Sequence, residues 1–323
     1  MIGAICVTVA VALLVPAGGR VFVELRLVDA GVVIVMFLGS LKIELARFRA
    51  AARRAHLIGL SLVSVFAVAP LVALGLAGAF GLDSDADRVA VLVCAAQAST
   101  LATAIVLTEV AGGDVALAIL ITVVNNTATA LVTPAVFHLL CDAAVEVHYG
   151  PMALEMALKV VAPVVVGQVA RRWLAARAHR HRRALSIASQ LVILTYIYTG
   201  VASTVARAGA HPGALLVRVL ALAATLHASL LLINALVARI ASRRAEERAA
   251  FVLCSSQKTL PAAILVWKSH FASLAAGPLV AVAYHMLQLV VDSLLAPGFR
   301  RLPLVRDPRG AAGSDQHERK RRR

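Results

Sequence analysis

Two short stretches of the sequence place hydrogen-bonding side chains and an amine among apolar residues. One runs from Cys254 to Thr259 and reads Cys-Ser-Ser-Gln-Lys-Thr, and the other contains Asn125, Asn126 and, further on, Thr129. Amide and hydroxyl oxygens can coordinate a cation or hydrogen-bond a solute, and a lysine ammonium can replace a cation or pair with an anion. These residue types predict a site that binds an ion or a small solute.

The composition around these residues is that of a membrane protein. Of the 323 residues, 60% are hydrophobic and only 15% are charged, with a mean hydropathy of +0.85. Soluble domains are about a quarter charged, whereas apolar stretches of about 20 residues can span a bilayer. Ten such segments lie near residues 2–17, 27–41, 57–80, 89–108, 115–140, 153–170, 184–206, 213–237, 248–267 and 275–297. We therefore predict an all-α membrane protein with ten transmembrane helices.

The basic residues predict how these segments are oriented. Most of the 32 Lys and Arg residues lie in residues 42–54, 171–183 and 239–248 and in the tail beyond Pro297, all on one side if there are ten crossings. Basic loops stay in the cytoplasm, so we expect a multi-pass protein of the plasma membrane with both termini cytoplasmic. The net charge of +15 then predicts contact with anionic lipid and no nucleic-acid partner.

The two halves of the chain repeat a motif. Residues 92–105 in the fourth segment and 252–264 in the ninth both contain Cys, then Gln three residues later, then Thr-Leu and Ala-Ile. Five segments per half is an odd number, so the second repeat is predicted to be inverted in the membrane. The predicted organisation is a first five-helix repeat in residues 1–145, an inverted repeat in 146–298 and a disordered basic cytoplasmic tail in 299–323. Chance similarity between two alanine-rich helices is the alternative.

Strongly polar side chains gather near the middle of four segments, two from each half. The residues expected to bind the solute or ion are Thr103, Asn125, Asn126, Thr129, Cys254, Ser255, Ser256, Gln257, Lys258, Thr259, His285 and Gln288. Transporters built from inverted repeats hold substrate and ions at such a midplane cluster. A single Ser or Thr could instead be a helix-packing contact, but an adjacent asparagine pair and a lysine in mid-span are hard to explain by packing.

The ninth segment is predicted to be a broken helix. Ser255, Ser256 and Thr259 compete for backbone hydrogen bonds, and Pro261 removes a donor inside the span. Such a break is tolerated where the freed backbone groups line a polar cavity. Pro261 is expected near the first turn of the second half-helix, whose N-terminal N–H groups favour an anion.

No acidic partner is expected at the depth of Lys258. The nearest candidates lie closer to the ends of their segments: Asp29, Glu109 and Asp292. Burial of an unpaired ammonium is costly in a membrane, so Lys258 is interpreted as a functional residue. It would act as a tethered cation or as a counter-charge to an anionic solute, and it could exchange a proton during the cycle.

Two other charged groups have structural interpretations. Asp83, Asp85 and Asp87 resemble a metal-binding motif, but they lie in a predicted loop with no fourth ligand, which favours a solvated acidic turn. Glu155 and Lys159 are spaced four residues apart in a predicted helix and are expected to pair with each other.

The run from Gly113 to Phe137, together with the repeated motif, resembles the bile acid:sodium symporter family. The stretch 257–260, Gln-Lys-Thr-Leu, and the pair Tyr284-His285 are most similar to its broader, symporter-like branch. The resemblance implies ten helices in two inverted repeats. A panel domain would come from the first, second, sixth and seventh helices and a core domain from the others, with the fourth and ninth helices broken where they cross.

The resemblance also implies where sodium ligands would lie, and several are missing. The family's glutamate and glutamine on the ninth helix fall at Cys254 and Lys258, and on the fourth helix only Thr103 keeps a side-chain oxygen. The fifth helix keeps its oxygens as residual sodium ligands: Asn125, Asn126 and Thr129. Without the carboxylate that offsets two sodium charges, the usual two-sodium coupling is not expected.

The leading hypothesis is a secondary active transporter of an organic anion, working by alternating access with sodium or a proton as coupling ion and without a cofactor. A non-transporting membrane protein that regulates ion, lipid or envelope homeostasis is the alternative. A membrane enzyme is disfavoured, because no carboxylate pair or nucleophile–base set converges in the sequence.

Overall fold

The computed structural model describes residues 2–15, 18, 27–41, 54–141, 147–205, 212–272, 277–302 and 305, which form helices with no strand among them. Within these residues, seven helical stretches are long and apolar enough to cross a membrane: Ala55–Ala79, Val115–Leu140, Tyr149–Arg180, Arg183–Ala202, Gly213–Ala241, Ala245–His270 and Pro278–Phe299. Gly3–Leu14 and Asp29–Leu41 are shorter apolar helices. The expected all-α membrane protein is confirmed at this level. Residues 306–323 of the predicted tail lie outside the described residues.

Every segment predicted to span the membrane contains helix. In chain order the elements are α1 (Ile2–Leu14), α3 (Leu27–Leu41), α5 (Ala55–Val63), η3 (Ser64–Val68), α6 (Ala69–Ala79), α7 (Asp85–Ala95), α8 (Thr103–Val110), α9 (Val115–Leu140), α10 (Tyr149–Met156), η4 (Ala157–Val161), α11 (Ala162–Arg180), α12 (Arg182–Val205), α13 (Pro212–Ala241), α14 (Ala245–Ser256), α15 (Leu260–His270), α16 (Gly277–Leu295) and η5 (Ala296–Arg301). Two of them, η3 and η4, are π-helical turns that continue the α-helices on either side.

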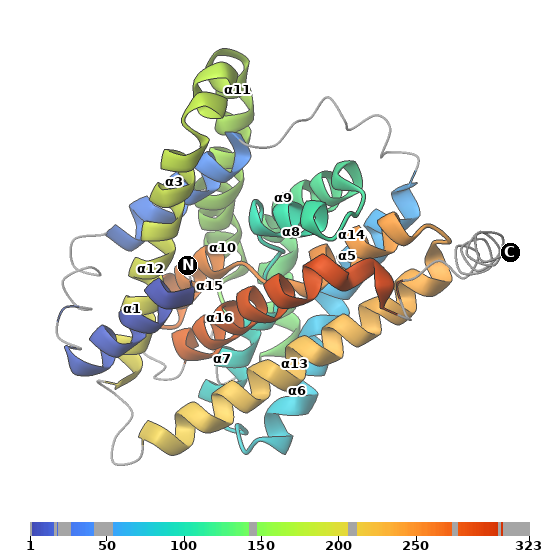
Figure 1. Cartoon of the computed structure of the whole chain (residues 1–323). Coiled ribbons are helices and arrows are strands. Elements are labelled where there is room, and N and C mark those ends of the chain that lie inside the picture. The colour runs from blue at the N-terminus through green and yellow to red at the C-terminus, as the bar shows by residue number, and fades with distance from the viewer. Residues whose placement is uncertain are drawn as a thin grey trace, which may run out of the picture.

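The helices form two groups. Figure 1 shows α1, α3, α11 and α12 together on one side of the molecule, and α3 packs against both α11 and α12. We call α1, α3, α10–α11 and α12 the four-helix group. The remaining helices form the larger group, in which α13 and α16 run alongside each other and α16 also packs on α7. The two groups meet where α10 and η4 contact α9, where α12 contacts α16, and where α3 and α12 contact α15.

A close approach fixes the packing of α3 on α11. A Cβ atom added at Gly167 on α11 would collide with the Ser40 hydroxyl and lie 2.8 Å from the carbonyl oxygen of Phe37, both on α3. A backbone carbonyl cannot rotate away as a side chain can, so only glycine allows the two helices to come this close. Gln168, the next residue, donates a hydrogen bond to the Ser40 carbonyl.

Two helices are interrupted in the middle of the larger group. The chain leaves helical structure between α7 and α8 and again between α14 and α15, at residues 257–259. Pro261 lies in the first turn of α15, where the missing N–H costs no intrahelical hydrogen bond. The break predicted for the ninth segment is therefore present. The two interruptions touch, because the amide of Thr259 donates to the carbonyl oxygen of Ala98 over 2.9 Å.

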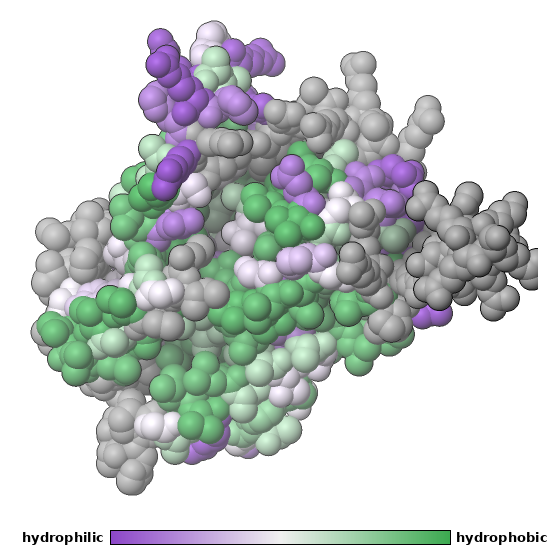
Figure 2. Space-filling model, viewed as in Figure 1, coloured by the Kyte–Doolittle hydropathy of each residue, from purple (hydrophilic) through white to green (hydrophobic). Residues whose placement is uncertain are grey.

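The surface is that of a protein embedded in lipid. Figure 2 shows a broad apolar area over the visible face, with hydrophilic residues gathered at the free end of α11 and beside α14. Large apolar side chains are more than two-thirds exposed at Leu14, Leu139, Ile240 and Leu294. Water would disfavour this exposure, whereas hydrocarbon tails accommodate it. The acidic turn predicted near Asp85 is the first turn of α7, where carboxylates interact favourably with the helix dipole.

Candidate solute and ion site

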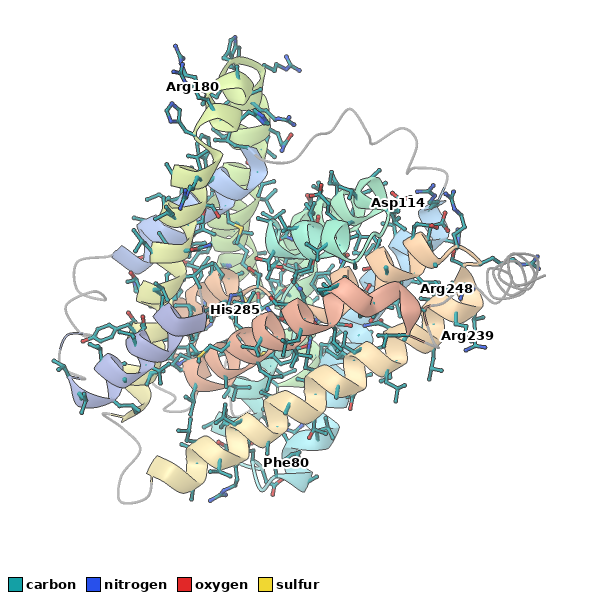
Figure 3. The ribbon with its side chains drawn as sticks, viewed as in Figure 1. Phe80, Asp114, Arg180, Arg239, Arg248 and His285 are labelled. Atoms are coloured by element: carbon teal, nitrogen blue, oxygen red, sulfur yellow. The ribbon has the colours of Figure 1, made fainter. Side chains whose placement is uncertain are left out.

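A cavity of about 100 Å³ lies where the two interruptions meet α3 and α12. Its lining residues come from five parts of the chain: Val35, Met36 and Gly39; Thr100, Leu101, Ala102 and Thr103; Ser186, Ser189, Gln190 and Ile193; Thr259 and Pro261; and His285. Figure 3 places His285 near the middle of the molecule. Three residues predicted for the site therefore line one cavity: Thr103, Thr259 and His285.

The α12 face of this cavity was not predicted from the sequence. Ser186, Ser189 and Gln190 line the cavity at positions that share one face of a helix. Their spacing of three and four residues inside an apolar segment is a sequence signal that could have identified them. Single serines in a span are usually packing contacts, which is why this signal is weak.

Lys258 is buried, with 2% of its surface exposed, and it does not line the cavity. Its ammonium donates to the carbonyl oxygens of Val65, over 2.8 Å, and Gln97, over 3.1 Å. Val65 belongs to the π-helical turn η3, and Gln97 to the interruption after α7. The lysine is thus directed into the larger group, where backbone carbonyls surround its charge as they would surround a bound cation.

Gln288 and His285 hold the peptide unit of Lys258. The amide of Lys258 donates to Gln288 Oε1, and Gln288 Nε2 donates back to the Lys258 carbonyl, each over 2.8 Å. His285 Nδ1 lies 3.3 Å from the same carbonyl. These contacts satisfy backbone groups that the interrupted helix leaves free, so both residues shape the break that positions Lys258.

The asparagines of α9 bind the first interruption from the other side. Asn126 donates to the carbonyl oxygens of Ser99, over 2.9 Å, and Thr122, over 2.8 Å. Thr129 is hydrogen-bonded to Thr133, whose hydroxyl donates to the Ala96 carbonyl. Because two residues of α9 hold carbonyls in the stretch between α7 and α8, this helix fixes the shape of the interruption.

Asn125, Ser255 and Ser256 connect helices within the larger group. Asn125 and Ser255 both bond the hydroxyl of Ser61 on α5, at 3.0 and 2.9 Å. Ser256 accepts a hydrogen bond from Asn234 on α13 over 3.0 Å. None of the three lines the cavity.

Cys254 also lies away from the cavity. Its thiol is 3.8 Å from the hydroxyl of Thr108 and from the carbonyl oxygen of Ala118. The residue is fully buried and belongs to a core of apolar side chains formed by α8, α9, α13 and α14. The structure therefore places this predicted site residue in a packing environment.

Several buried polar atoms near the interruptions have no hydrogen-bond partner within the part of the chain that the structure describes. They are Gln97 Oε1, Ser99 Oγ, Asn125 Oδ1, Asn126 Oδ1 and His285 Nε2. Buried polar groups are nearly always paired with protein, water or an ion. Four of these five atoms are oxygens, the atom type that coordinates water or an alkali cation.

Among the described residues, the ammonium of Lys258 contacts backbone carbonyls and no carboxylate, as expected, but the sequence did not predict the buried carboxylate beside its neighbour Gln257. Asp292 is completely buried, and its Oδ2 accepts a hydrogen bond from Gln257 over 2.7 Å. Its Oδ1 lies 2.9 Å from Nε2 of His227, another buried residue. The prediction rested on the position of Asp292 near the end of its segment. In the structure α13 packs against α16, and the side chain of Asp292 is buried there. Two sequence signals were available: His227 falls in mid-segment, and Asp292 shares a helix face with Gln288.

A half-buried cluster of ion pairs joins the four-helix group to α15. Lys268 on α15 pairs with Asp29 on α3 at 2.5 Å, and Asp29 also pairs with Lys159 at 3.1 Å. Lys159 pairs with Glu155 at 2.6 Å, which confirms the predicted pair of charges four residues apart. Glu155 in turn lies 2.9 Å from His270 Nε2.

A second cavity, of about 460 Å³, lies between α13, α16 and η5. Its lining is apolar except for His227: Ala224, Ala228, Leu231, Leu232, Ala235, Val252, Leu287, Val291, Leu295, Phe299, Leu302 and Val305. Such a lining offers almost nothing to orient a polar solute. The smaller, polar cavity at the interruptions is therefore the better candidate for a solute site.

Comparison with known proteins identifies the family. The sequence profile of the SBF-like CPA transporter family matches residues 1–301. A similar protein is the uncharacterized protein PA2026 of Pseudomonas aeruginosa, which is 27% identical over 92% of each chain. The sodium/bile acid cotransporter 7 of mouse is 25% identical over 61% of this chain and 60% of its own length. The probable sodium/metabolite cotransporter BASS4 of indica rice is 26% identical over 63% of this chain and 52% of its own. The chain belongs to the SBF-like CPA transporter family, a family of membrane transporters and not of enzymes.

Proposed function

We propose that this protein is a secondary transporter that carries a small organic anion across the membrane by alternating access. In this proposal all ten helical segments cross the membrane in two inverted repeats, the four-helix group is the panel and the larger group is the core. The observation that carries the proposal is the polar cavity at the contact between the two interrupted helices. Interrupted helices at a repeat interface are where transporters of this architecture bind their substrates.

The ends of two helices favour an anion in this cavity. Thr103 begins α8 and Leu260 begins α15, and the cavity is lined by Thr103, Thr259 and Pro261 at these two N-termini. A helix N-terminus carries a partial positive charge and presents N–H groups that no helical carbonyl uses. Ser189 and Gln190 would add neutral hydrogen bonds from the panel.

The size of the cavity favours a solute smaller than a bile acid. Sites for drug-sized ligands usually enclose about 300–1,000 Å³, whereas this cavity is about 100 Å³. A carboxylate of a few heavy atoms matches that space. A steroid would require the panel and core to move apart first.

The contacts of Lys258 support a transporter that does not need sodium. The ammonium lies between two backbone carbonyls, and Cys254 stands where the resembling family has a glutamate. A tethered cation would replace the mobile one, and the unpaired oxygens of Asn125 and Asn126 would hold water or a residual ion. Because the Lys258 ammonium is directed away from the cavity, a direct counter-charge to the solute is the less supported of its two expected roles.

The ion-pair cluster supports alternating access. Asp29 lies at the start of α3, and the cavity touches the same helix further along, from Val35 to Gly39. Under the orientation predicted from the basic loops, Asp29 and Lys268 face the outside. The cluster would then close the external side of the panel–core interface while the cavity lies toward the cytoplasm.

Uptake into proteoliposomes tests this function. Purified protein is reconstituted and offered radiolabelled acetate, pyruvate, 2-oxoglutarate and taurocholate, with sodium or with choline as the external cation. We expect saturable uptake of at least one small carboxylate, at equal rates in sodium and choline. A protein that moves none of the four acids while it still binds one in a thermal-shift assay would favour the non-transporting alternative.

A further inference from the structure

His227 and Asp292 form a titratable pair inside the larger group. Both side chains are at most 1% exposed, and they belong to α13 and α16. Nε2 of His227 and Oδ1 of Asp292 are 2.9 Å apart. The sodium-ligand positions implied by the family resemblance include neither residue, and neither lines the solute cavity.

The hydrogen bonds around the pair fix how many protons it holds. The Tyr284 hydroxyl donates its only proton to the Ser256 carbonyl over 2.7 Å. Nδ1 of His227, 3.1 Å from the same hydroxyl oxygen, must therefore carry a proton and donate it. One further proton lies between Nε2 and Asp292 Oδ1, because without it two acceptors would face each other at 2.9 Å. We call this state, with one proton on Nδ1 and one between Nε2 and Oδ1, the loaded pair.

Two side chains connect this pair to the solute cavity. Asp292 Oδ2 accepts from Gln257 Nε2, and Gln257 Oε1 accepts from the hydroxyl of Thr100. Thr100 lines the cavity, and its hydroxyl also accepts from the amide of Ala104 in the first turn of α8. Asp292 is thus linked to the second interruption through Gln257 and, one hydrogen bond further, to the first interruption through Thr100.

Other titratable and charged groups lie on the elements packed against α13 and α16. Within the described residues they are Asp85, Asp87, Arg88 and Cys94 on α7; Glu246, Glu247, Arg248 and Cys254 on α14; His56 on α5; Arg183, Tyr196 and Tyr198 on α12; Lys268 and His270 on α15; Arg218 and Arg239 on α13 itself; Tyr284 and His285 on α16 itself; and Lys258 in the second interruption. No titratable residue lies on α6, which also packs on α13. Lys258 directly follows Gln257, so an amine is carried by the residue next to the one that joins Asp292 to the cavity lining.

We propose that the His227–Asp292 pair is the proton-binding site that couples solute movement to a proton gradient. The proposal rests on the transport function argued above. The proton comes from water on the side where the solute binds, resides between Nε2 and Oδ1 during the crossing, and leaves to water on the other side. Loss of that proton would leave two facing acceptors, disturb the contact of Asp292 with Gln257, and so change the two interruptions that line the cavity.

Asp292→Asn tests the proposal with little disturbance of the fold. The carboxamide can donate to Nε2 of His227 and accept from Gln257, so every hydrogen bond of the loaded pair is retained without a proton to release. Glu109→Gln, at an exposed carboxylate on α8, is the matched control. His227→Gln, which can also donate to Asp292, is the second variant if Asp292→Asn does not fold.

The measurement is pyruvate accumulation in proteoliposomes under an inward proton gradient, with protein-free liposomes to subtract passive entry. A gradient of one pH unit can concentrate an acid moved with one proton about tenfold. We expect this accumulation in wild type and in Glu109→Gln. Asp292→Asn should exchange labelled for unlabelled pyruvate at a near wild-type rate but accumulate none. Accumulation by Asp292→Asn equal to wild type would overturn the proposal.

A solute-independent readout separates this proposal from the transport function. Potentiometric titration of the purified proteins between about pH 8 and about pH 5 counts bound protons. Wild type should take up about one more proton per chain than Asp292→Asn. If wild type moves no acid at all, the transport function fails, and equal proton counts in the two proteins would then overturn the proton site as well.

Discussion

The ammonium of Lys258 donates a hydrogen bond to the carbonyl oxygen of Val65 across 2.8 Å. Val65 lies in a π-helical turn, where backbone hydrogen bonds are displaced from the regular α-helical pattern. The contact joins the third helical segment to the interruption of the ninth. The contact thereby stabilises the interruption whose next residue, Thr259, lines the cavity.

Removal of this cation is expected to stop transport. Lys258→Met leaves the Val65 and Gln97 carbonyls without their donor, so uptake should fall at least tenfold while the protein still inserts in the membrane. Lys258→Arg should restore little, because a guanidinium is larger and planar. Proteoliposome uptake, with thermal stability as the check on folding, measures both. Uptake by Lys258→Met at the wild-type rate would show that transport does not need the positive charge of Lys258.

A double variant tests whether the lysine replaces sodium. Cys254→Glu combined with Lys258→Gln returns the two residues to the types that the resembling family has there. We expect uptake by the double variant to depend on external sodium, whereas wild-type uptake is the same in sodium and choline. An absolute sodium requirement in wild type would contradict the idea of a tethered cation.

The sequence predicted those features whose physical cause is local. Pro261 and the neighbouring hydroxyls predicted the break, and a lysine in an apolar segment indicated Lys258, because each is costly in a membrane without a special role. The environment of Asp292 was not predictable in this way. Its burial depends on His227, 65 residues earlier in the chain, and only the packing of α13 on α16 brings the two together.

The ion-pair cluster is expected to keep the cavity closed from outside. In the proposed orientation, Ser189→Cys should react slowly with a membrane-impermeant maleimide added externally, because the Asp29–Lys268 pair would close that side. Adding Asp29→Asn removes two ion pairs of up to about 1 kcal/mol each, so labelling should increase by up to about 30-fold. Asp83→Asn, at an exposed acidic residue before α7, is the control. Equal labelling in both backgrounds would contradict a gate at this position.

The contact of α9 with the first interruption is expected to support transport more than folding. Asn126→Ala removes the hydrogen bond to the Ser99 carbonyl and leaves that group unpaired, at a cost of about 1–3 kcal/mol. Solute affinity should fall roughly tenfold. Thr127→Val, at an exposed position on the same helix, should transport normally. If both variants behave as wild type in uptake kinetics, α9 does not shape the site.

The tight packing of α3 on α11 predicts a stability effect. Gly167→Ala forces its new methyl group against the Phe37 carbonyl, and overpacking of this kind costs about 1–3 kcal/mol. The midpoint of thermal unfolding in detergent should fall by at least about 2 °C. Gly59→Ala is the matched control, because a Cβ there meets no atom within 4 Å. Equal midpoints would show that α3 and α11 can relax at this contact.

The central claim is that the solute passes through the cavity at the two interrupted helices, and a pair of tryptophan variants on α12 tests it most directly. Ser189→Trp fills the cavity from the panel side, whereas Leu191→Trp adds the same bulk at a side chain that is 58% exposed. The measurement is counterflow of the best transported acid in proteoliposomes. The account predicts loss of counterflow in Ser189→Trp and wild-type counterflow in Leu191→Trp. Normal counterflow in Ser189→Trp would contradict it, because the solute would then have to take another route.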